Sequence, residues 1–104
     1  MSILNFPNDY PRITTMESGH LSLELTDRIS YDNFHEYAEN LLSTIGGSVE
    51  EKHDANVMCI WDVMINQHQY RLVYDDYPCG VFLESSSTAS DNELTRIKEM
   101  LLED

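Results

Sequence analysis

Apolar and polar side chains alternate along the middle of the chain, in two segments that a short polar link joins. The first segment covers residues 57–65, the second covers residues 70–74, and the link covers residues 66–69. A period of two residues is typical of a strand that has one face buried and the other face open. The pattern therefore predicts an antiparallel hairpin, which a third strand at residues 79–84 extends.

The turn of this hairpin is predicted to be centred on Gln67 and His68, which sets the register of the two strands. In that register one face of the hairpin is apolar and aromatic throughout. Such a face is typical of the side of a sheet that packs against helices, and we interpret its aromatic residues as core. The facing pairs on it are Ile65 with Tyr70, Val63 with Leu72, and Trp61 with Tyr74, and Val81 and Leu83 join them from the third strand.

The opposite face of the same strands mixes apolar and charged side chains, and we call it the mixed face. Asp62 and Arg71 lie diagonally across the two strands in the predicted register, close enough for an ion pair. An apolar patch with a charged rim is typical of an interaction surface unless other residues cover it. Two interpretations stay open, coverage by residues 1–6 and contact with a partner or a second subunit. The mixed face consists of Ile60, Asp62, Met64, Arg71, Val73 and Phe82.

Two further regions with strand character lie upstream of the hairpin. Residues 20–26 place three leucines on one side and polar residues on the other, and residues 12–17 pair with them in a second predicted hairpin. Residues 48–53 are charged, which suits an edge strand because charged side chains discourage pairing with another chain. The sheet is therefore expected to hold four to six strands.

Two segments show the period of 3.6 residues that marks an amphipathic helix. The first runs from Ser30, a suitable N-cap, to Ile45, and the glycines at 46–47 suit its termination. The second is predicted to start at Ser90, because Ser90 and Glu93 have the spacing of a capping box. The apolar stripe of the second helix is Leu94, Ile97 and Leu101.

These elements define an α+β fold, an antiparallel sheet of four to six strands with two amphipathic helices packed on one face. A length of 104 residues suits one hydrophobic core, so residues 1–104 are expected to form a single domain. Residues 1–11 contain two prolines and show no hydrophobic period, which predicts an irregular N-terminal arm.

The balance of charges narrows the range of partners. The chain has 19 Asp and Glu residues against 6 Lys and Arg residues, which gives a formal net charge of -13. That charge repels phosphate backbones and anionic lipid headgroups, so neither nucleic acid nor a membrane is an expected partner. The sequence shows neither a long apolar span nor a secretory signal, and we expect a cytoplasmic protein.

Residue types that could carry chemistry are present, but they form no recognised motif. His35 and Glu39 have the i, i+4 spacing of metal ligands on a helix, which an acidic helix surface also produces by chance. Cys59 lies between apolar residues of a predicted strand, where a thiol usually behaves as a small hydrophobe. No catalytic, cofactor-binding or metal-binding residue is predicted. The alternative is an enzyme or small-ligand binder with an aromatic pocket, which clustering of Cys79 with a histidine would favour.

The layout of the whole chain, with a capped helix, a Trp-bearing hairpin and a C-terminal helix, resembles small acidic bacterial families of uncharacterised function. The resemblance implies no site and no activity. By analogy alone the layout is also similar to secretion chaperones and to immunity proteins that neutralise basic toxins. The predicted function is a non-catalytic module that binds a basic protein partner, or associates with itself as a homodimer, without a cofactor.

Overall fold

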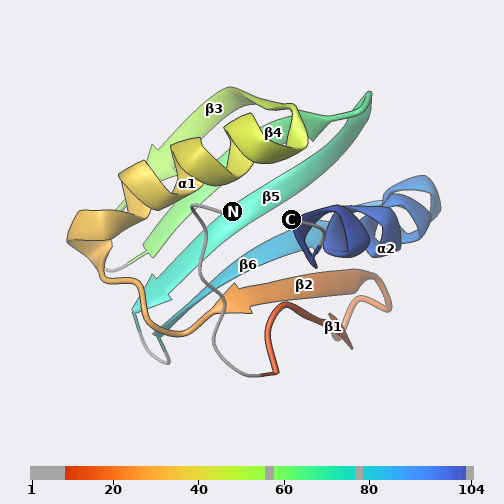
Figure 1. Ribbon diagram of the computed structural model, residues 1–104, viewed down its shortest axis with the longest axis horizontal. Helices are drawn as coiled ribbons and strands as arrows, with labels where there is room; N and C mark the ends of the chain where they lie inside the picture. The colour runs from red at the N-terminus through yellow and green to blue at the C-terminus, as the bar shows by residue number, and fades with distance from the viewer. Residues whose placement is uncertain (1–8, 56–57, 77–78, 103–104) are drawn as a thin grey trace.

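The computed structural model describes residues 9–55, 58–76 and 79–102, and within these ranges six strands form one antiparallel sheet. The strands are β1 (Arg12–Thr15), β2 (Leu21–Thr26), β3 (Gly47–Asp54), β4 (Met58–Ile65), β5 (His68–Asp76) and β6 (Cys79–Ser85), and the helices are α1 (Tyr31–Ile45) and α2 (Thr88–Leu102). The strands lie in the order β1-β2-β6-β5-β4-β3, and both helices cover one face of the sheet (Figure 1). The predicted α+β class is confirmed.

The core lies between the sheet and the two helices. Buried and partly exposed residues alternate along β4, so that Cys59, Trp61, Val63 and Ile65 face the helices. The buried residues of β2, β5 and β6 extend this surface, and the apolar stripes of both helices close it from the other side. The prediction that the aromatic face of the central hairpin is core is confirmed. The largest fully buried side chains are those of Trp61, Tyr70, Tyr74 and Phe34.

The register of the β4–β5 hairpin differs from the predicted one by two residues. Ile65 pairs with His68 rather than with Tyr70, and the loop is reduced to Asn66 and Gln67. Both loop residues have positive φ, 51° and 68°, and two-residue loops of this kind match the right-handed twist of the flanking strands. The predicted register was wrong because the two-residue loop lets the paired strands continue as far as Ile65 and His68. A shift of two residues leaves every side chain on its predicted face.

Helix α1 begins and ends where the sequence predicts. Ser30 is the N-cap in an extended conformation, and its hydroxyl accepts a hydrogen bond from the side-chain amide of Asn33 at 3.1 Å. Gly46 ends the helix with φ of 74°, and its N–H donates to the Leu42 carbonyl. Glycine adopts this left-handed conformation without a steric cost, so the chain turns there and enters β3 at the next residue.

Helix α2 begins earlier than the predicted capping box. Its first residue is Thr88, and the Ser87 hydroxyl accepts a hydrogen bond from the backbone N–H of Ser90 at 3.1 Å, as an N-cap does. The prediction that Ser90 is the N-cap was wrong, because this serine is buried and its hydroxyl donates to the Gln69 carbonyl at 3.1 Å. The predicted stripe is confirmed as buried, at Leu94, Ile97 and Leu101.

The two edges of the sheet are β1 and β3. Strand β3 is exposed along almost its whole length and carries charged side chains, which confirms the predicted edge strand. Strands β1 and β2 form the second predicted hairpin, and β2 buries Leu23 and Leu25 against the helices. Neither helix in the described part of the chain is long and apolar enough to cross a membrane.

Some predictions concern residues that the structure does not describe. Residues 1–8 of the predicted N-terminal arm lie outside the described ranges. The prediction that residues 1–6 cover the mixed face therefore also lies outside them. Residues 9–11 form neither helix nor strand, as expected for that arm. Val57, the predicted first residue of the central hairpin, is also outside these ranges, and β4 is described from Met58.

The hydroxyl of Tyr37 is buried without a hydrogen-bond partner among the described residues. Desolvation by burial raises the pKa of this phenol well above its ordinary value. We expect Tyr37→Phe to leave the free energy of unfolding unchanged or to raise it by about 1 kcal/mol, because phenylalanine removes a polar group that has lost its hydration. Urea unfolding followed by circular dichroism measures the difference.

A matched contrast is Tyr70→Phe. The Tyr70 hydroxyl is also buried but donates to the Ser90 carbonyl at 3.3 Å. Its removal leaves that carbonyl with one partner fewer, and we expect a loss of about 1 kcal/mol. Equal losses in the two variants would show that the Tyr37 hydroxyl has a bonding partner after all.

Candidate functional site

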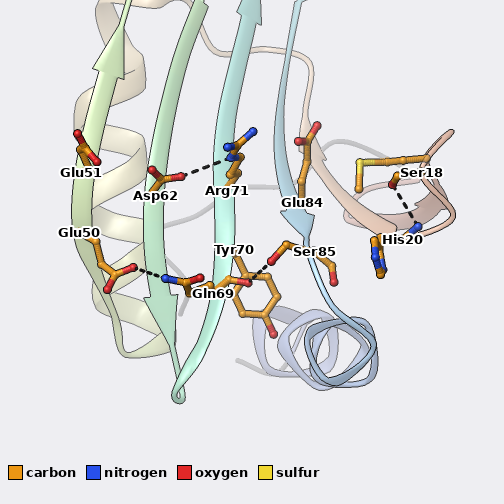
Figure 2. A pocket seen from close by; sticks show the side chains of 12 residues that line it. Ser18, His20, Glu50, Glu51, Asp62, Gln69, Tyr70, Arg71, Glu84 and Ser85 are labelled. Atoms are coloured by element: carbon orange, nitrogen blue, oxygen red, sulfur yellow. Dashed lines mark hydrogen bonds and ion pairs between the residues drawn. The ribbon is translucent and has the colours of Figure 1, made fainter.

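A row of charged side chains crosses the open face of the sheet, the face opposite the helices (Figure 2). We call it the charged row. Its members occupy facing positions on four neighbouring strands, β3, β4, β5 and β6. The predicted ion pair in it is confirmed, since Arg71 Nε lies 3.4 Å from Asp62 Oδ1, and the two residues face each other directly rather than diagonally. In strand order the charged row is Glu51, Asp62, Arg71 and Glu84.

Glu84 stands apart within the charged row because it is partly removed from water. Burial raises the pKa of its carboxyl group, and the positive charge of Arg71 offsets this shift only in part. A carboxylate in this position is stabilised by any further cation that approaches it. Arg71 is already shared with Asp62, so its charge is divided between two carboxylates.

A cleft of about 750 Å³ opens beside the charged row, between the hairpin end of the sheet and the β1–β2 turn (Figure 2). Its wall contains the carboxylates of Glu50, Glu51, Asp62 and Glu84 against the guanidinium of Arg71. The cleft is therefore an electronegative hollow. The remaining lining residues are Met16, Ser18, His20, Gln69, Tyr70, Ser85 and Ser86.

Apolar side chains form the next row along the open face. Ile60, Val73 and Phe82 occupy facing positions on β4, β5 and β6. Val73 is 8% exposed, and the other two are half-buried. The structure thus brings the predicted mixed face together on one side of the sheet, with a charged row beside an apolar row and Met64 at the hairpin end.

A second cluster lies on the helix side of the sheet, and we call it the thiol cluster. It consists of His35 on α1, Asp54 at the end of β3 and Cys59 on β4. His35 Nε2 lies 2.9 Å from Asp54 Oδ2, and the ligand atoms of all three residues lie within 4.8 Å of one another. Trp61 Nε1–H donates to the other carboxylate oxygen of Asp54 at 3.0 Å. The hydrogen bond from the indole therefore fixes the orientation of the Asp54 carboxylate.

The electrostatics of the thiol cluster hold its thiol in the protonated form. Burial, followed by the adjacent Asp54 carboxylate, raises the pKa of Cys59 to about 11. The hydrogen bond from His35 holds the pKa of the Asp54 carboxyl below its usual value. A thiol with a raised pKa is a poor nucleophile at neutral pH, because the thiolate is the attacking species. The arrangement therefore lacks the activated cysteine of a thiol hydrolase.

The chain matches a family model described as a protein of unknown function (DUF3630), over residues 12–101. It belongs to the DUF3630 family. The predicted resemblance to a family of uncharacterised function is confirmed. The DUF3630 match begins at the first residue of β1 and reaches the last turn of α2, so the mixed face and the thiol cluster both lie inside it. Comparison with curated proteins and with solved structures found no match.

In this DUF3630 chain, the thiol cluster is the feature that sequence reasoning missed. The i, i+4 spacing of His35 and Glu39 was not taken as a metal site, and the structure pairs His35 with Asp54. One local signal was present, since Asp54 and Cys59 flank the turn between two predicted strands and face each other across it. The position of α1 over the adjoining ends of β3 and β4 has no local signal. The side chain of Cys79, the other candidate thiol, is outside the described residues.

Proposed function

We propose that the open face of the sheet binds a basic segment of another protein, and that the chain acts by binding rather than by catalysis. The observation that carries this proposal is the excess of carboxylates in the cleft, which is lined by four acidic side chains and by one arginine, Arg71. Arginine and lysine side chains of a partner are the groups that such a hollow recognises.

Glu84 is the residue that gains most from such a partner. Its carboxylate is partly desolvated and shares Arg71 with Asp62. A guanidinium or ammonium group placed in the cleft would supply the missing positive charge, which stabilises the ionised carboxylate. The charged row thus provides specificity for a basic group at a defined position.

The apolar row next to the cleft supports a protein as the partner rather than a small cation. Stable protein interfaces combine an apolar centre with a polar rim. Ile60 and Phe82 are half-buried beside the charged row, and they suit a segment in which apolar side chains alternate with basic ones. The formal net charge of -13 would speed the encounter with such a segment at low ionic strength.

The test uses a panel of immobilised peptides in which Lys or Arg alternates with apolar residues, with neutral peptides of the same length. We expect selective binding to basic members of the panel and an association rate that falls as salt is added. The double variant Glu51→Gln and Glu84→Gln should weaken binding by about tenfold, or about 1.4 kcal/mol. Surface plasmon resonance measures both quantities.

The matched control removes two charges from the exposed surface of α1, with Glu36→Gln and Glu39→Gln. It has the same net charge as the cleft variant, and its affinity should stay near the wild-type value. Equal weakening in both double variants would mean that the affinity for the peptides depends on net charge alone, and this would reject the cleft as the binding site.

Self-association through the same face is the rival within this proposal. Light scattering on the wild type and on Phe82→Asp separates the two, since the substitution places a charge in the apolar row. If the wild type is a dimer and Phe82→Asp is a monomer, the open face binds a second copy of the chain rather than a basic protein. Identical monomer masses would remove the rival.

A further inference from the structure

We propose that the thiol cluster is a binding site for a transition-metal dication of the Zn²⁺ type, with His35 Nε2, Asp54 Oδ2 and Cys59 Sγ as ligands. Imidazole nitrogen, carboxylate oxygen and thiolate sulfur are the three kinds of protein ligand that Zn²⁺ takes. The ligand atoms come from three different elements, α1, β3 and β4, and converge within 4.8 Å of one another. This site is independent of the proposed protein-binding surface.

The distances suit a tetrahedral ion after a small adjustment. Bonds of about 2.0–2.3 Å place the ligands of a tetrahedral ion roughly 3.3–3.7 Å apart. His35 and Asp54, now 2.9 Å apart through a hydrogen bond, would separate slightly as each turns its lone pair to the ion. Cys59 stays within reach of both. The side chains of His35 and Asp54 are 42% and 31% exposed, which gives an ion access from solvent.

The surroundings of the cluster have the outer contacts that metal ligands usually need. A ligating carboxylate is normally held by a further hydrogen bond, and the Trp61 indole supplies one to Asp54. The Tyr31 hydroxyl lies within hydrogen-bonding reach of the Cys59 thiol. Three protein ligands leave a fourth position, which water or this hydroxyl would fill.

The charge balance also favours a cation here. The Asp54 carboxylate and the Cys59 thiolate that forms on binding together balance the two positive charges of the ion. When the ion binds, the Cys59 thiol proton passes to solvent, and the imidazole binds as the neutral tautomer, with its proton transferred through solvent from Nε2 to Nδ1. The Asp54–His35 hydrogen bond is thereby exchanged for two metal bonds, and no oxidation takes place.

The other group of potential ligands among the described residues, Glu51, His53 and Asp62, is a weaker candidate. It lies on the open face, and its Asp62 carboxylate is already bound to Arg71 and to His53. The guanidinium of Arg71 repels a cation at that place. This group contains no sulfur ligand, so its members serve as internal controls.

The experiment titrates Co²⁺, a spectroscopic substitute for Zn²⁺, into the reduced full-length protein. We expect one Co²⁺ per chain, the near-ultraviolet thiolate-to-cobalt charge-transfer band and the intense visible bands of tetrahedral coordination, all of which Zn²⁺ abolishes. Cys59→Ser should lose the charge-transfer band. His35→Ala, at a half-exposed position of α1, should weaken binding by at least about tenfold.

His53→Ala and Cys79→Ser are the controls, and both should give the wild-type spectrum. Circular dichroism shows that each variant is folded, and the His35→Ala result stands even if Cys59→Ser fails to fold. The proposal is overturned if Co²⁺ binds without a thiolate band, if the band survives in Cys59→Ser but not in Cys79→Ser, or if His35→Ala and His53→Ala weaken binding equally.

Discussion

Replacing Trp61 by alanine is expected to lower the free energy of unfolding by about 3–5 kcal/mol. The indole is fully buried, and its ring centroid lies 5.2 Å from that of Phe34 and 5.4 Å from that of His35. Its N–H donates to Asp54 at 3.0 Å, and the Lys52 ammonium lies 4.2 Å over the ring. Alanine removes these contacts and leaves a cavity that the close-packed surroundings fill only in part.

A loss of this size is a large fraction of the 5–15 kcal/mol that typically stabilises a small domain, as a rough guide. Trp61 is the single tryptophan of the chain, so unfolding should be followed by far-ultraviolet circular dichroism rather than by fluorescence. Trp61→Phe keeps most of the aromatic volume and should cost about 1–2 kcal/mol. An alanine variant as stable as the wild type would show that the indole does not occupy the core.

Replacing Asp91 by asparagine is expected to destabilise the protein at neutral pH and to lose this effect in acid. The Asp91 carboxylate accepts a hydrogen bond from the Leu21 backbone N–H at 2.8 Å and lies 3.0 Å from His20 Nδ1. It therefore ties the start of α2 to the start of β2. Hydrogen bonds to a charged group that is partly open to solvent contribute about 1–2 kcal/mol.

The pH dependence follows from the pKa of Asp91, which the contacts with His20 and with the Leu21 N–H lower from 3.8 to about 2. A carboxyl group whose pKa is lower in the folded state stabilises that state above its unfolded pKa, and the effect is lost as the pH falls. The difference in unfolding free energy between the wild type and Asp91→Asn should therefore shrink between pH 3.8 and about 2.

Urea unfolding at a series of pH values measures this difference. Asp27→Asn is the control, because Asp27 is exposed in the loop before α1 and its replacement also removes one negative charge. That control should follow the wild type closely across the series. A difference between the wild type and Asp91→Asn that stays constant down to pH 2 would contradict the assigned contacts.

The two proposed sites use opposite faces of the same strand. Successive side chains of β4 point to opposite sides of the sheet, so Cys59 and Trp61 face the helices while Ile60 and Asp62 face the open side. Variants of the charged row should therefore leave metal binding intact, and variants of the thiol cluster should leave peptide binding intact. The failure of one proposal would not imply the failure of the other.

The periodicity of the sequence predicted which face of each central strand is buried, because alternation of side chains is a local property of a strand. It did not predict the register, since the loop of Asn66 and Gln67 carries no glycine to mark it. The predicted N-cap of α2, Ser90, was wrong for a similar reason. Ser87 is the N-cap instead, because the Ser90 hydroxyl is buried and donates to the carbonyl of Gln69, a residue distant in sequence.

The sequence by itself determined the α+β class, both helix stripes, the charged edge strand and the mixed face, because each depends on spacing and end signals within one segment. Only the tertiary structure decided that β2 lies beside β6 and that α1 places His35 over Asp54 and Cys59. Such contacts depend on how distant segments pack together, and no pattern within a single segment records them. The cleft and the thiol cluster, which carry both proposals, are of this second kind.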